Sequence, residues 1–208
     1  VRTMCGRYYI NSNILKKIEQ VEAVSGISGI SGRETVQGSR RDIRPSETAP
    51  VLVKNGKSPG RGRQVHIEWM NWGFPVPEGK KLIINARSES AMEKSMFREK
   101  IRTNRCVIPA AGFYEWNRQK EKSEFCREEQ DELFLAGFYG KIAGENRFVI
   151  LTTEANPSVA PVHGRMPLIL ERDEAVSWII DDSRTGEFLH KVPGALSRKQ
   201  EYEQLTLF

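Results

Sequence analysis

The chain has 208 residues, of which 38% are hydrophobic and 28% are charged, and its formal net charge is +5. These proportions exclude wholesale disorder, and the length favours one domain with a sizeable core over two small ones. No apolar run approaches the roughly 18 residues of a membrane span, and no basic-then-apolar leader is present, so we expect a cytoplasmic protein without membrane contact. The small basic excess raises the odds of a polyanionic partner only modestly.

The residues up to Pro45 combine short ordered elements with one flexible stretch. Arg7–Ile10 is β-prone, and apolar residues at helical spacing after Asn13, a suitable N-cap, predict a short helix over 14–24. Residues 25–41 open with the low-complexity run SGISGISG and predict a flexible, basic loop. Arginines then lead into Pro45, which disfavours a helix and predicts an extended segment.

From Val51 onward the chain is rich in predicted strands. Apolar or alternating runs between turn residues predict strands over Val51–Lys54, Val65–Trp69, Leu82–Asn85, Cys106–Ile108, Phe113–Trp116, Leu133–Ile142, Arg147–Thr153 and Pro167–Leu170. Helices are predicted over 88–101, 173–180 and 186–191. We therefore expect an α+β fold: one domain spanning 1–208, with a strand-rich, barrel-like curved sheet, a few short flanking helices and a tail at 202–208.

The three cysteines, Cys5, Cys106 and Cys126, are widely spaced and form no Cys-x-x-Cys pair. An odd number at such spacings indicates neither a disulfide framework nor a zinc site. We expect no metal and no organic cofactor. Cys5 draws attention because it lies so near the beginning of the chain.

A cysteine at a mature N-terminus carries a thiol and an α-amine on adjacent carbons, with reference pKa values of about 8.5 and about 7.7 to 8.0. The amine can form a Schiff base with an aldehyde, and the thiol can then close a five-membered thiazolidine onto the imine. The competing interpretation is that Cys5 is a small buried core residue, as free cysteines often are. From this residue alone the core interpretation is the better supported.

Three further segments carry polar residues in positions suited to chemistry. Asn85 ends a short apolar strand, and Glu115 lies between two aromatic residues, which would disfavour its charged form. His163 and Arg165 flank a glycine, so that one could move protons and the other could hold a phosphate. Taken singly, an outward-facing Glu115 and a structural His163 are the more ordinary interpretations.

Together, and in this order, the segments MCGRY, NARSE, CVIPAAGFYEW, TTEAN and VHGRMP resemble the SRAP (SOS response-associated peptidase) family. A Trp72-Gly73-Phe74 segment also matches, and the resemblance runs from Met4 to about Leu170. It implies covalent capture of abasic sites in single-stranded DNA, protecting the lesion during the DNA damage (SOS) response.

Four catalytic roles are implied by this resemblance. Cys5 is the nucleophile through its amine and thiol, and Asn85 holds the cysteine and the opened sugar in place. Glu115 moves protons at the amine and the sugar oxygen, while His163 acts as an acid or base during formation and reversal of the imine. How the proton transfers divide between Glu115 and His163 stays open.

The resemblance also suggests how DNA is held. Arginine pairs bidentately with phosphate oxygens, tryptophan stacks on any base, and a proline can wedge the strand at the lesion. The DNA-binding residues expected on these grounds are Arg7, Pro45, Trp72, Arg87, Trp116 and Arg165. We expect a monomer that binds single-stranded DNA containing abasic sites, without sequence preference and more weakly at high salt.

One departure concerns the first residues. The cysteine of this family directly follows the initiator methionine, whereas here Val1–Met4 precede Cys5. While they remain attached, Cys5 has an amide in place of an amine and no Schiff base can form. Translation starting at Met4, which we favour, residues added for expression, and self-removal of a leader are the three explanations.

Two other classes of function compete with DNA capture. In a cysteine-dependent peptidase, Cys5, His163 and Asn85 would serve as nucleophile, base and orienting residue. A single-stranded DNA binding module without chemistry would rely on the arginines and tryptophans and would not need Cys5. Cleavage of DNA at abasic sites, a lyase activity, is a variation on capture, because an imine promotes elimination.

Overall fold

The computed structural model describes residues 5–14, 40–56, 65–76, 79, 81–128 and 132–200. The expectations for the leader Val1–Met4, for most of the helix over 14–24, for nearly all of the loop at 25–41 and for the tail at 202–208 lie outside the described residues.

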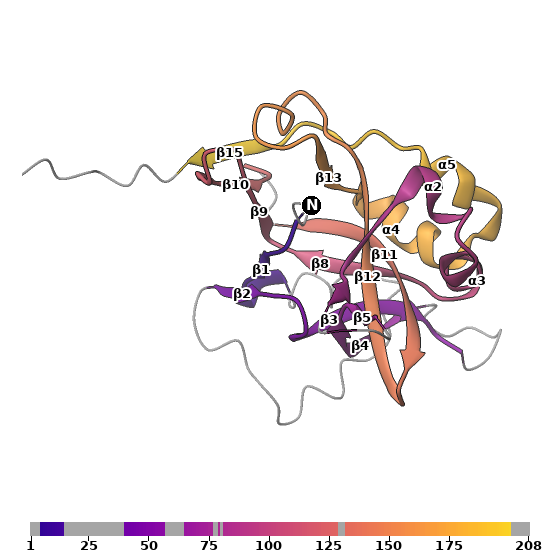
Figure 1. Cartoon of the computed structure of the whole chain (residues 1–208). Helices are drawn as coiled ribbons and strands as arrows, with labels where there is room; N and C mark the ends of the chain where they lie inside the picture. The colour runs from indigo at the N-terminus through magenta and orange to yellow at the C-terminus, as the bar shows by residue number, and fades with distance from the viewer. Residues whose placement is uncertain are drawn as a thin grey trace, which may run out of the picture.

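A closed β-barrel forms the centre of the molecule (Figure 1). Its strands follow one another in the order β12, β4, β3, β8 and β11, and β11 pairs again with β12 to complete the ring. Their bounds are β3 Thr48–Lys54, β4 Val65–Trp72, β8 Arg105–Ala110, β11 Leu133–Ile142 and β12 Glu145–Glu154. Short strands extend the sheet beyond the ring: β7 Asn85–Arg87 and β13 Arg165–Pro167 pair with β12, and β14 Ile169–Leu170 pairs with β11. The predicted barrel-like sheet is therefore confirmed.

A second, five-stranded sheet packs beside the barrel. Its order is β15, β10, β9, β1 and β2, with bounds β1 Tyr8–Ile10, β2 Arg41–Ile43, β9 Gly112–Trp116, β10 Lys122–Cys126 and β15 Ser197–Gln200. A separate pair, β5 Phe74–Pro75 and β6 Leu82–Ile83, completes the strands among the described residues. The sequence-based prediction missed β10 and β15, because both are polar strands without the apolar alternation of the others.

Side chains of the second sheet alternate between its two faces. Tyr8 pairs with Phe113, and both are wholly buried toward the barrel. On the other face the rings of Tyr9 and Tyr114 lie 5.6 Å apart. A Cβ at Gly112 would lie 2.5 Å from the Tyr9 hydroxyl and 2.6 Å from the backbone oxygen of Phe125, so a larger residue at this position would clash with both neighbouring strands.

Helices cover the side of the barrel away from the second sheet (Figure 1). They are α2 Ser88–Ala91, α3 Ser95–Thr103, α4 Arg172–Ile180, the 3-10 turn η1 Asp182–Arg184 and α5 Thr185–Leu189. The prediction of one helix over 88–101 is wrong, because the helix is interrupted between Ala91, where α2 ends, and Ser95, where α3 begins. Arg98 compensates the break by donating hydrogen bonds to the carbonyls of Met92 and Glu93.

Candidate active site

Cys5 lies just before β1 and is wholly buried. Its backbone nitrogen donates a hydrogen bond of 2.5 Å to Oε1 of Glu115, 110 residues away in the sequence. Its carbonyl oxygen accepts a hydrogen bond from Nδ2 of Asn85 at 3.4 Å. The fold thus joins three of the four expected catalytic residues around one backbone unit.

The strand pairings explain why these residues meet. Glu115 follows Phe113 by two positions on β9, so it faces the barrel from the same side as Tyr8 and Phe113. Asn85 begins β7, which pairs in parallel with β12 through Asn85 and Ile150. The nitrogen of Cys5 therefore meets β9 of the second sheet, and its carbonyl oxygen meets β7 of the barrel sheet.

Burial changes the protonation of the two titratable groups in this site. The pKa of Glu115 rises to about 8, because burial disfavours its charged form more than the N–H groups of Cys5 and Trp116 favour it. Burial, and then the charge of Glu115, raise the pKa of the Cys5 thiol well above its usual range. At neutral pH both groups consequently hold their protons.

His163 is held by its neighbour Arg165. Its Nδ1 accepts a hydrogen bond from the Arg165 backbone nitrogen at 3.1 Å and lies 3.2 Å from the Arg165 carbonyl oxygen. An imidazole that accepts a hydrogen bond at Nδ1 has Nε2 available as a donor. The backbone of Arg165 therefore fixes the orientation of the His163 ring.

The loop that carries His163 is anchored by Asn156, the last residue of TTEAN. Its Nδ2 donates to the carbonyls of Pro193 at 3.1 Å and Gly194 at 2.7 Å, and its Oδ1 accepts from the Ser158 backbone at 3.0 Å. Asn156 is buried, so these bonds tie the loop to the segment before β15. The motif that contains Asn156 was noticed in the sequence, but this role depends on a contact with a distant segment and could not be predicted.

Five of the six residues expected to bind DNA, all but Trp72, are at least partly exposed. Arg87 is exposed at the end of β7, and Pro45 is partly exposed in the turn between β2 and β3. Trp116 lies on the Tyr114 face of β9, opposite Glu115, and the Arg7 guanidinium lies 5.5 Å from the centre of its ring. The Arg7 guanidinium also lies 3.7 Å from the carboxylate of Asp42, which partly neutralises its positive charge.

One expectation needs correction, and the surroundings of a second residue need description. Trp72 is wholly buried, its ring stacks on Phe148, and its Nε1 donates to the carbonyl of Ile84 at 3.0 Å. It has no face left for a base, so the prediction that it stacks on DNA is wrong. Arg165 is paired bidentately with Glu89 at 2.6 and 2.8 Å, which the sequence analysis did not foresee although NARSE contains Glu89.

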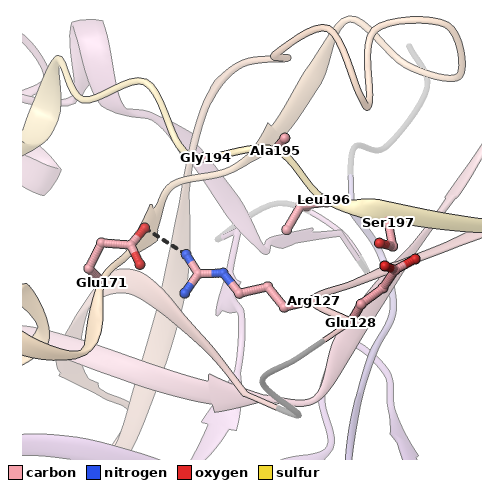
Figure 2. A pocket seen from close by; sticks show the side chains of 7 residues that line it. All are labelled: Arg127, Glu128, Glu171, Gly194, Ala195, Leu196 and Ser197. Atoms are coloured by element: carbon pink, nitrogen blue, oxygen red, sulfur yellow. Dashed lines mark hydrogen bonds and ion pairs between the residues drawn. The ribbon is translucent and has the colours of Figure 1, made fainter.

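A separate hollow lies between the end of β10, the beginning of α4 and the segment before β15 (Figure 2). It has a volume of about 480 Å³ and is lined by Arg127, Glu128, Glu171 and residues 194–197. Arg127 donates to Glu171 across it at 2.6 Å. None of the expected catalytic residues lines this hollow.

Within the described ranges, no cluster of three or more His, Cys, Asp or Glu side chains is arranged to hold a metal ion. Nor does that part of the chain contain a helix long and apolar enough to cross a membrane.

Residues 4–205 match the family model described as SOS response associated peptidase (SRAP). Abasic site processing protein YoaM of Bacillus subtilis (strain 168) is 29% identical over 203 residues, which cover 91% of this chain and 85% of that protein. Abasic site processing protein HMCES of Xenopus tropicalis is 28% identical over 173 residues, which cover 65% of this chain and 52% of that protein.

Solved structures share the fold at low sequence identity. A protein from Bordetella bronchiseptica matches with a TM-score of 0.73 at 22% identity, covering 95% of this chain and 100% of that one. A protein from Bacteroides thetaiotaomicron matches with a TM-score of 0.73 at 19% identity, covering 96% of this chain and 93% of that one. At these identities the likeness concerns the fold alone.

Proposed function

Because this chain belongs to the SOS response associated peptidase (SRAP) family, we propose that it processes abasic sites in DNA by capturing them covalently through Cys5. The observation that carries the proposal is the hydrogen bond of 2.5 Å between the Cys5 nitrogen and the Glu115 carboxyl. The names of the relatives as abasic site processing proteins support the choice of substrate.

The capture begins with proton exchange at the Cys5 nitrogen. Once that nitrogen is an α-amine, its reference pKa of about 7.7 to 8.0 lies close to the pKa of about 8 of Glu115. Matched pKa values let a proton pass in either direction without a large energetic penalty. Protonated Glu115 therefore gives its proton to the oxygen that leaves as water and takes one back from the attacking nitrogen.

The bonds then change in two steps. The amine attacks the aldehyde carbon of the opened deoxyribose, and loss of water leaves an imine. The Cys5 thiol adds to the imine carbon, its proton passes to the nitrogen, and a thiazolidine closes. Asn85 keeps the cysteine in register through its bond to the Cys5 carbonyl, and neutral His163 offers its Nε2 proton to a sugar oxygen.

We assign the binding of single-stranded DNA to the exposed part of the expected set. Arg7 and Arg87 contact phosphates, Trp116 stacks on a flanking base, and Pro45 wedges the strand at the lesion. A lesion without a base offers no sequence to read, so the affinity is set by phosphate contacts and stacking and decreases with salt. Elimination from the imine would give lyase activity as a minor outcome.

Self-removal of the leader is a second candidate activity, favoured by the backbone of Cys5. Its φ of 32° lies in the left-handed region, which costs a non-glycine residue about 1 to 3 kcal/mol. The thiol would attack the Met4 carbonyl carbon, and the bond to the Cys5 nitrogen would break as Glu115 protonates that nitrogen. Water would then hydrolyse the thioester, releasing the leader and restoring the thiol.

A denaturing gel tests both activities. The protein is incubated with single-stranded DNA bearing one abasic site, in a form whose translation begins at Met4 and in one that keeps Val1–Met4. We expect a heat-stable shifted band from the first form and none from its Cys5→Ala variant. A band from the longer form as well indicates that the leader is removed, which the mass of its N-terminal peptide verifies.

No band from a Met4 form whose methionine has been removed would contradict covalent capture. Salt-sensitive binding that survives Cys5→Ala would then favour a binding module without chemistry. Turnover of a peptide substrate in the absence of DNA would favour a peptidase.

A further inference from the structure

The guanidinium of Arg165 is occupied by a carboxylate of the same chain. Nη1 donates to Oε1 of Glu89 at 2.6 Å, and Nη2 donates to Oε2 at 2.8 Å. Nη2 also donates to the carbonyl of Thr152 at 2.7 Å, which fixes the plane of the guanidinium. Two parallel bonds from one guanidinium to two oxygens are also the geometry with which arginine binds a phosphate.

The exposure of the two partners shows which of them faces solvent. The Arg165 side chain is 13% exposed, whereas the Glu89 side chain is 43% exposed. The carboxylate therefore lies on the solvent side of the pair, in front of a guanidinium that is otherwise set into the protein. A phosphate approaching from solvent meets Glu89 before it meets Arg165.

The location of the pair connects it with the candidate active site. Glu89 lies in α2, two residues after the exposed Arg87 and four after Asn85. Arg165 follows His163 by two residues and holds its ring through the backbone. A strand of DNA that reaches the site and contacts Arg87 would thus pass close to the Glu89–Arg165 pair.

We propose that Glu89 occupies the phosphate-binding edge of Arg165 in the free protein and that a backbone phosphate of single-stranded DNA displaces it on binding. This inference rests on the proposed function and deepens it. The carboxylate keeps the guanidinium oriented and neutralised until DNA arrives, and it lowers the affinity for undamaged strands that cannot be captured covalently. Glu89 therefore favours the release of undamaged strands, whereas a strand joined to Cys5 is retained by its covalent bond.

The exchange has a consequence for the salt dependence of binding. A phosphate bound by a free arginine releases its condensed counterion, which contributes about 0.7 to the slope of log affinity against log salt for a single strand. A phosphate that displaces Glu89 leaves a carboxylate that attracts a cation again, so little net release accompanies that contact. Removing the charge of Glu89 should restore the net release of a counterion when Arg165 binds a phosphate.

The test compares Glu89→Gln with wild type in fluorescence anisotropy titrations of an undamaged single strand at several salt concentrations. We expect about fivefold tighter binding at low salt, as for loss of one partly exposed competing charge, and a slope steeper by about 0.7. Glu93→Gln is the matched control, because Glu93 is exposed, lies four residues further along and changes the net charge equally. Its slope should remain that of wild type.

A double-mutant cycle decides whether the effect passes through Arg165. In an Arg165→Gln background, Glu89→Gln should no longer tighten binding or change the slope. An equal gain in that background, or a gain no larger than that of Glu93→Gln, would overturn the inference. If Arg165→Gln does not fold, as judged by thermal melting, the slope difference between Glu89→Gln and Glu93→Gln decides alone.

The two proposals can fail separately. Normal cross-linking of abasic DNA together with an unchanged Glu89→Gln slope overturns only the role of Glu89. Absence of single-strand binding by both wild type and Glu89→Gln overturns the role of Glu89 and the proposed function together.

Discussion

Arg105 and Glu115 are both buried and ionisable, but they have different numbers of hydrogen-bond partners. Arg105, 3% exposed at the start of β8, donates to the carbonyls of Trp178, Ile101, Arg102 and Ile179 and pairs with Asp182. Glu115, 2% exposed at the end of β9, accepts a hydrogen bond from the Cys5 nitrogen and interacts favourably with the Trp116 N–H.

The number of partners determines what each group does. Arg105 satisfies the last carbonyls of α3 and α4 and fixes both helices to the barrel, so its charge stabilises the fold. Glu115 has too few donors to remain ionised after burial, and its pKa rises to about 8. A buried charge with many partners is thus structural, whereas one with few partners retains a proton that it can transfer.

Replacing Cys5 should have the largest effect. Cys5→Ala keeps the α-amine but removes the thiol, so an imine can form while the thiazolidine cannot close. We expect no heat-stable adduct on a denaturing gel, with an adduct recovered when borohydride is present during the reaction. Cys126→Ala is the control and should cross-link like wild type, and loss of the adduct in both variants would contradict a specific role for Cys5.

The next effect should come from Glu115→Gln, which cannot move a proton. Loss of general acid–base catalysis lowers rates by about 10² to 10⁴, and single-turnover cross-linking should slow by this order. The wild-type rate should rise with pH as the amine loses its proton and fall above about pH 8 as Glu115 ionises. The variant should lose the fall, and Glu121→Gln, at an exposed position, should leave rate and profile unchanged.

The same carboxyl should make stability depend on pH. Its pKa is about 8 in the folded protein and about 4.3 in the unfolded chain, so between these values only the unfolded state releases the proton. The free energy of unfolding should therefore fall by about 1.4 kcal/mol for each pH unit across that window, relative to Glu115→Gln. Urea unfolding at pH 5 and pH 8 measures the free energies of unfolding of wild type and Glu115→Gln. If the difference between the two proteins were the same at both pH values, the raised pKa of Glu115 would be contradicted.

Arg105→Ala should unfold more easily without losing chemistry. Removing the guanidinium leaves the buried carbonyls of Trp178 and Ile101 without their donor, which costs about 1 to 3 kcal/mol for each group, whereas Asp182 is 75% exposed and loses little. Urea titration should show this loss, while the molecules that remain folded should cross-link at the wild-type rate. Arg102→Ala, at an exposed position of α3, should leave the free energy of unfolding nearly unchanged.

The smallest effect should separate the two tryptophans. Trp116→Ala should weaken binding of undamaged single strands by about 1 kcal/mol, near the lower end of the range for loss of one stacked base. Trp72→Phe should lower the melting temperature and leave the affinity of the folded protein unchanged, since Trp72 is wholly buried. Weaker DNA binding by a fully folded Trp72→Phe protein would contradict the conclusion that buried Trp72 makes no contact with DNA.

Much of the fold follows from local patterns in the sequence. Apolar alternation and turn residues predicted all five barrel strands, because each of them buries apolar side chains. The polar strands β10 and β15 depend on pairing with each other, which no local pattern reveals. The break between α2 and α3 is likewise compensated by one side chain, Arg98, which donates to the carbonyls of Met92 and Glu93.

The candidate site was predicted mainly through the resemblance of its motifs to a family. Local chemistry alone favoured an inert Cys5 and an outward-facing Glu115, and only the pairing of β1 with β9 places the two in contact. The burial of Trp72 and the pairing of Glu89 with Arg165 are tertiary contacts, 76 residues apart in the second case. Neither can be derived from the residue types or their spacing.

The most direct test of covalent capture is mass spectrometry of the adduct after digestion of the protein and the DNA. We expect the peptide Cys5–Arg7 to carry the opened deoxyribose less one water and its thiol to resist alkylation, because nitrogen and sulfur are both in the thiazolidine ring. An adduct on a lysine, or on a Cys5 whose thiol still reacts or whose nitrogen is still joined to Met4, would contradict this expectation.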